Sequence, residues 1–79
     1  MSNYDHYAAA RDLTSSLEEE GYAADAAKLR SAIANGATGT EIFMELRFHL
    51  SEIIQRVPMT AQSWITASRL LAELNDALE

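Results

Sequence analysis

Glu45, His49 and Glu52 are the residues whose types and spacing come nearest to a chemical site. His49 follows Glu45 by four residues and precedes Glu52 by three, so all three lie along one edge of a helix. Carboxylates and an imidazole on adjacent turns can bind a metal ion, and di-iron bundles carry a Glu-x-x-His pair on each of two helices. Here the order is reversed and there is no second copy. The sequence therefore predicts a hydrogen bond or ion pair at the margin of a core, with no metal and no cofactor.

Catalytic chemistry has little support elsewhere in the chain. His6 falls on an apolar stripe, but no nucleophile or second acid–base group accompanies it. The serines stand in helical patterns without a nucleophile elbow. The Gly-containing segment 35–40 lacks the glycine and lysine spacing of a phosphate-binding loop. We expect a protein that is not an enzyme.

Met44 and Phe48 stand in the most apolar stretch of the chain, residues 41–57, but outside its main stripe. Helical spacing predicts that the main stripe faces a core, and its members are Ile42, Phe43, Leu46, Leu50, Ile53, Ile54 and Val57. Met44 and Phe48, four residues apart, fall on roughly the opposite face. Either they pack beneath another helix, or they form an exposed apolar patch, which marks a protein interface.

The acidic character of the chain bears on what such a patch could bind. Six basic against twelve acidic residues give a net charge of −6, which disfavours binding to nucleic acids and anionic membranes. A DNA-reading helix would need basic or amide side chains on its outward face, where Glu41, Glu45 and Glu52 stand instead. These three would form the rim of an interface with a basic protein, with Met44 and Phe48 as its anchors.

Four helices would position these residues in a single domain, residues 1–79. Apolar residues recur at spacings of three and four, and no segment alternates as a strand does. Short connections make neighbouring helices run roughly antiparallel. The sequence predicts an all-α fold, a compact antiparallel four-helix bundle, with helices at about residues 3–20, 23–34, 40–57 and 61–78. The alternative is a three-helix core with the first helix docked loosely against it.

The ends of these helices are predicted from glycine, threonine and proline. Gly21 is expected to take a left-handed conformation after the first helix, and the Asn-Gly pair at 35–36 to end the second in the same way. Thr38 is predicted to cap the third helix, with Thr40 as a competing candidate, and Thr60 to cap the fourth. Pro58 is predicted to end the third helix.

The inward seam of the last helix is predicted from residues repeating at three and four. Its members would be Trp64, Ala67, Leu71, Leu74 and Leu78.

The chain has no cysteine, no basic start followed by an apolar run, and no run of about 18 apolar residues. We therefore expect a cytoplasmic protein.

The segment from Leu17 to Leu50 resembles a group of small uncharacterised bacterial proteins. They share a glycine after the first helix, an Ala/Leu-rich second helix, and a G-x-T-G-T-E-I-x-M-x-L-R-like start to the third. The matching positions are Gly36, Thr38, Gly39, Thr40, Glu41, Ile42, Met44, Leu46 and Arg47. Some small acidic helical proteins of this general kind look like immunity partners of secreted toxins. The resemblance implies an inhibitor that neutralises a basic toxin, such as a nuclease, by direct binding. The alternative is a self-associating structural or regulatory module, a homodimer.

Overall fold

The computed structural model describes residues 3–79, and these form four α-helices joined by short connections. The helices are α1 (His6–Glu19), α2 (Ala23–Asn35), α3 (Gly39–Arg56) and α4 (Ala61–Leu78). The described residues contain no strand, and the predicted all-α four-helix bundle is confirmed. Helix α1 begins later than predicted because Asp5 is its N-cap: the Asp5 carboxylate accepts a hydrogen bond from the backbone N–H of Ala8 at 3.0 Å.

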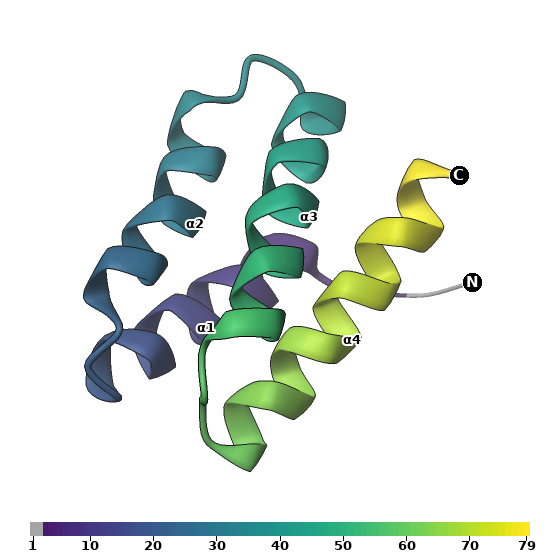
Figure 1. Ribbon diagram of the computed structural model, residues 1–79. Coiled ribbons are helices and arrows are strands. Elements are labelled where there is room, and N and C mark those ends of the chain that lie inside the picture. The colour runs from purple at the N-terminus through teal and green to yellow at the C-terminus, as the bar shows by residue number, and fades with distance from the viewer. Residues whose placement is uncertain (1–2) are drawn as a thin grey trace.

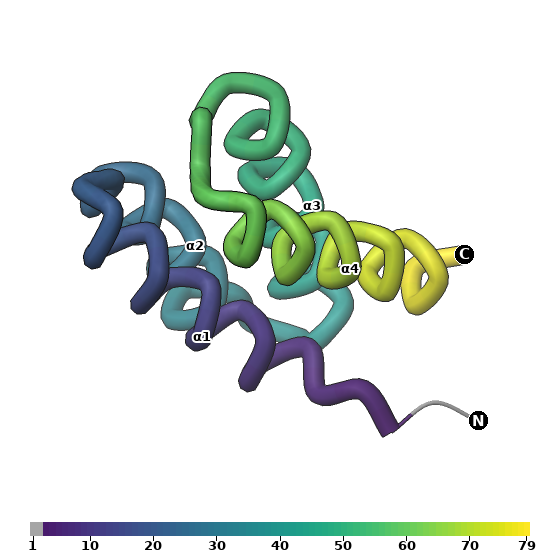
Figure 2. Tube along the Cα trace, turned by 90° about the horizontal axis from the view of Figure 1, so that it is seen from below, coloured from purple at the N-terminus to yellow at the C-terminus, as the bar shows by residue number. Residues whose placement is uncertain are grey.

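Each helix packs against two others, and the contacts close a ring in the order α1, α2, α3 and α4. In Figure 1, α2 and α3 run side by side in opposite directions, α4 follows α3 at an angle, and α1 crosses behind. Figure 2 shows from below that α1 lies beside α4. One long face of α3 therefore has α2 on one flank and α4 on the other. Within residues 3–79, no helix combines the length and apolar character that crossing a bilayer requires.

The core is formed by one apolar stripe from each helix. Its buried members are Ala10, Leu13, Leu17, Ala26, Leu29, Ala32, Leu46, Leu50, Ile53, Val57, Ala67, Leu70 and Leu74. The predicted core stripe of α3 is confirmed, since each of its seven members is buried or packs against the core. Thr38 and Thr60 cap α3 and α4 as predicted, because their hydroxyls accept hydrogen bonds from the N–H groups of Glu41 and Ser63.

The predicted seam of α4 is wrong at Trp64, which is 51% exposed. The residues of α4 that point inward are Ser63, Ala67, Leu70 and Leu74. The Ser63 hydroxyl donates a hydrogen bond to the carboxylate of Glu20, so this small polar side chain is satisfied inside the bundle. Burying Ser63 turns the helix so that its neighbour, Trp64, lies at the surface.

The two glycine turns differ from each other. Gly21 has a φ of 94°, and the N–H of Tyr22 donates to the carbonyl of Leu17 at 2.8 Å, so the predicted ending of α1 is confirmed. The prediction for Gly36 is wrong, because its φ of −71° and ψ of 134° are extended. A glycine is required there by close packing: a Cβ on Gly36 would collide with the side chain of Ile42.

Polar contacts join neighbouring helices at the end of the bundle where α1 meets α2. The Glu20 carboxylate accepts hydrogen bonds from the Ser63 hydroxyl and from both the N–H and the hydroxyl of Thr60. Asp25 of α2 is buried and pairs with Arg56 of α3. A second ion pair, Arg30 with Glu18, is exposed, with the two side chains 2.9 Å apart, and surface pairs of this kind contribute little stability.

Aromatic contacts join the start of α1 to α3 and α4. The ring of His6 lies 4.6 Å from that of Phe43, centroid to centroid, and Arg69 lies 4.8 Å above the centre of the Tyr4 ring. The Nε2 atom of His6 is 3.3 Å from the carbonyl oxygen of Glu73. Because a carbonyl oxygen only accepts, Nε2 must carry the proton that this contact needs.

Candidate functional site

Met44 and Phe48 lie at the surface of α3. They are 50% and 59% exposed, whereas Leu46 and Leu50, on the opposite face of the same helix, are 0% exposed. Among residues 3–79 no other helix covers them, so packing beneath a neighbouring helix is not their role. We refer to these two side chains as the apolar ridge.

The three acidic residues predicted to surround the apolar ridge are also exposed. Glu41 and Glu45 stand one turn apart, and Glu52 follows beyond Phe48. The first turn of α3 suits Glu41, because the helix dipole favours an anion there and the Thr38 hydroxyl donates to its carboxylate at 3.4 Å. All five predicted site residues therefore share the outward part of one helix.

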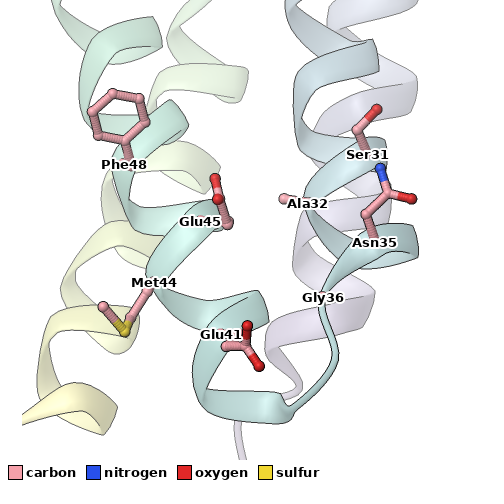
Figure 3. Close-up of a pocket in the computed structure, with 8 residues that line it drawn as sticks. All are labelled: Ser31, Ala32, Asn35, Gly36, Glu41, Met44, Glu45 and Phe48. Atoms are coloured by element: carbon pink, nitrogen blue, oxygen red, sulfur yellow. The ribbon is translucent and has the colours of Figure 1, made fainter.

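A groove of about 660 Å³ lies between α2 and α3, on one side of the apolar ridge. It is lined by Ser31, Ala32 and Asn35 of α2, by Gly36 directly after that helix, and by Glu41, Met44, Glu45 and Phe48 of α3. Figure 3 shows Glu41 and Glu45 on the part of α3 that faces α2, and Met44 pointing away from that helix. We call this hollow the α2–α3 groove.

A second groove, of about 530 Å³, lies on the other side of the ridge, between α3 and α4. Its lining residues are Met44, Arg47, Phe48, Ser51, Glu52 and Gln55 of α3 and Asn75 of α4. Met44 and Phe48 line both grooves, so the apolar ridge separates them. We call this second hollow the α3–α4 groove.

The two grooves differ in charge. The α2–α3 groove is lined by Glu41 and Glu45 and by no cationic side chain, whereas the α3–α4 groove is lined by both Glu52 and Arg47. Within the described residues, neither Glu41 nor Glu52 forms an ion pair. Carboxylates without a cationic partner are available to a basic molecule that approaches this face.

His49 sits at the edge of the site. Its Nε2 lies 3.5 Å from a carboxylate oxygen of Glu45, which confirms the predicted polar contact, but Glu52 takes no part in it. The Phe48 ring meets the His49 ring edge to face, with centroids 5.3 Å apart. Among residues 3–79, no three His, Asp or Glu side chains lie close enough together to hold a metal ion. His49 therefore supports the ring of Phe48 from one side and orients Glu45 from the other.

Sequence reasoning missed the groove walls outside α3. Ser31 and Asn35 of α2 and Asn75 of α4 are polar helical residues, and their periodicity does not indicate which of them faces a neighbouring helix. Trp64 and Ile65 were not expected to be a second exposed apolar pair, at 51% and 59%. Neither of these two lines the α2–α3 groove or the α3–α4 groove.

Comparisons of this chain with protein-family models, with curated proteins and with solved structures find no match. The resemblance of Leu17 to Leu50 to small helical bacterial proteins therefore stays a prediction. The arrangement itself suits binding: it presents an apolar ridge, two grooves and an acidic rim on rigid helices.

Proposed function

We propose that this protein is a non-enzymatic binding module that engages a basic protein through the outward face of α3. The observation that carries the proposal is the exposure of Met44 and Phe48, at 50% and 59%, beside the carboxylates of Glu41 and Glu52, which form no ion pair among residues 3–79. Methionine and aromatic side chains are enriched at the centres of interfaces, where a few of them supply most of the binding energy. The carboxylates at 41, 45 and 52 would speed the encounter with a positively charged partner and select against acidic ones.

In its most specific form, the proposal is that the partner is a toxin and this chain is its immunity protein. A nuclease is the partner class that fits best, because an enzyme that binds a phosphate backbone carries a positive substrate site. An acidic helical face can cover such a site and block the substrate. This form is supported by the resemblance of Leu17 to Leu50 and by the net charge of −6.

The test uses the protein encoded next to this chain's reading frame, mixed with this chain and measured by calorimetry. Phe48→Ala and Met44→Asp should each weaken binding at least about 30-fold, the loss expected of a residue central to an interface. Circular dichroism should remain native for both.

Matched controls come from the exposed pair on α4. Ile65 has the same 59% exposure as Phe48, and Trp64 at 51% matches Met44 at 50%. Ile65→Ala and Trp64→Asp should therefore leave binding within about twofold, as surface substitutions outside an interface do. Equal losses from both pairs, or unfolding of the α3 variants, would contradict the proposal.

Self-association through the same face is the competing function. A two-fold dimer would place the acidic rims of two copies near each other, which the net charge of −6 disfavours. Light scattering over a wide concentration range separates the two functions. A monomer throughout removes the dimer, whereas a dimer that Phe48→Glu dissociates would replace the present proposal.

A further inference from the structure

The α2–α3 groove indicates what kind of element the partner presents. We propose that it receives a basic amphipathic helix, whose apolar side chains lie along the apolar ridge and whose Lys or Arg side chains meet Glu41 and Glu45. This inference rests on the proposed function and adds to it the structure and chemistry of the docking element.

The shape of the groove suits a helix. Three of the four residues on the α2 side of the groove are small, whereas all four on the α3 side have long or aromatic side chains. The α2 side is lined by Ser31, Ala32, Asn35 and Gly36, and the α3 side by Glu41, Met44, Glu45 and Phe48. Two neighbouring helices with one low wall leave a channel in which a third helix can lie, as ridges pack into grooves. The α3 wall extends from residue 41 to residue 48, a rise of about 10 Å, or two turns of a docked helix.

An extended peptide fits this site less well. An extended segment leaves its own N–H and C=O groups unpaired, and it binds well where a sheet edge completes them. Residues 3–79 contain no strand and therefore offer no such edge. A helix satisfies its backbone groups internally and needs only side-chain contacts from the groove.

Charge favours the α2–α3 groove over the α3–α4 groove. Glu41 and Glu45 are four residues apart, so their carboxylates repeat at one helical turn, about 6 Å. Basic residues at the same spacing on a docked helix would face both of them. The α3–α4 groove has only one carboxylate, that of Glu52, and it is also lined by the positively charged Arg47. The Arg47 side chain would repel a basic helix.

The experiment uses three synthetic 18-residue peptides and the full chain. The first is an amphipathic helix of leucine, alanine and lysine with lysines at i and i+4 beside the leucine stripe. The second has the same composition in scrambled order, and the third has glutamate in place of each lysine. Fluorescence anisotropy should show at least tenfold tighter binding of the first peptide than of the other two. Amide shifts in NMR spectra should concentrate on Ser31, Asn35, Glu41 and Glu45.

Two tryptophan substitutions fill one groove each. Ser31→Trp blocks the α2–α3 groove and should weaken binding of the first peptide at least tenfold. Asn75→Trp fills the α3–α4 groove and should change the affinity for the first peptide by less than about twofold. A double variant, Glu41→Lys with Glu45→Lys, should exchange the preference, so that the glutamate peptide binds more tightly than the lysine peptide. This exchange does not depend on how the tryptophan variants fold.

Three results would overturn the inference: no binding of the lysine helix at millimolar concentration, shifts centred on Arg47, Ser51 and Asn75, or equal binding of the scrambled peptide. Each leaves the proposed function standing if the neighbouring protein still requires Phe48. Loss of that requirement would instead remove the proposed function, whichever peptide binds.

Discussion

The two apolar faces of α3 carry side chains of similar size, but they differ in what covers them. Leu46, Leu50 and Ile53 are 0% exposed at the centre of the bundle, while Met44 and Phe48 are 50% and 59% exposed on the far side of the same helix. Burial of the inner face removes apolar surface from water on folding and stabilises the bundle. The outer face can gain this stabilisation only when a partner covers it. One helix can therefore serve folding and binding through separate residues, and substitutions on the two faces should have separable effects.

Leu50→Ala should have the largest effect on stability. The side chain is completely buried, so its truncation loses the transfer free energy and leaves a cavity, at a cost of about 2–5 kcal/mol. Chemical denaturation followed by circular dichroism measures this cost. A cost below about 1 kcal/mol would mean that the inner face of α3 contributes little to the stability of the core. The contrast between the two faces would then be wrong.

Gly36→Ala should have the next largest effect, about 1–3 kcal/mol, the usual cost of overpacking. The added Cβ collides with the side chain of Ile42 and lies 3.2 Å from the carbonyl oxygen of Ala32, so α2 and α3 must shift apart.

Gly39→Ala is the matched control. The nearest heavy atom to its Cβ would be the Tyr7 hydroxyl at 3.8 Å, and alanine favours a helix, so this variant should be neutral or stabilised by up to about 1 kcal/mol. Thermal unfolding that ranks the two variants in the opposite order would disprove the close approach at Gly36.

A smaller effect, which depends on pH, is expected at Glu20. Hydrogen bonds from the Ser63 hydroxyl and from Thr60 hold the pKa of the Glu20 carboxyl below its ordinary value of 4.5. A depressed pKa in the folded state contributes stability that is present above pH 4.5 and is lost as the pH falls through the folded-state pKa.

Glu20→Gln should therefore lower the unfolding temperature near pH 7 and flatten its decline between about pH 5 and pH 3. Ser63→Ala removes the main donor and should flatten the same decline by a smaller amount, because Thr60 continues to donate. Thermal melts at a series of pH values measure both. A slope identical to that of the unmodified chain in both variants would exclude Glu20 from the acid response.

The smallest effect on stability is expected for Phe48→Ala. Its ring is 59% exposed and lies outside the core, so the free energy of unfolding should change by less than about 0.5 kcal/mol. Denaturation beside Leu50→Ala, two positions away in sequence, compares the two faces directly. A cost above about 2 kcal/mol would assign Phe48 to the core and merge the two faces into one.

The inner face of α3 was predictable because every member is large, apolar and at helical spacing. The caps at Thr38 and Thr60 were also predictable, since each hydroxyl bonds to an N–H only three residues away. The seam of α4 was not, because the burial of Ser63 depends on Glu20, which lies 43 residues away in sequence. A pattern that ranks positions by side-chain size places Trp64 inside, and only the position of α1 shows otherwise.

The residues of the candidate site were predictable, but its shape was not. Periodicity assigned Met44 and Phe48 to the face opposite the core stripe, and it left open whether another helix covered that face. The answer depends on α2 and α4 flanking α3 without crossing over it, which is a property of helix packing angles. For the same reason the α2 wall, with Ser31 and Asn35, could be identified only once the helices were placed.

The contact between His6 and Glu73 joins residues 67 positions apart, and this separation bears on the order of folding. The pairs α1–α2, α2–α3 and α3–α4 are adjacent in the chain, so each forms by closing a short loop at low entropic cost. Only the pairing of α1 with α4 requires nearly the whole chain to be gathered first. We expect the α1–α4 contact to form last during folding and to open first in the native state. Amide hydrogens at the start of α1 and the end of α4 should then exchange with solvent well before those in the middle of α3.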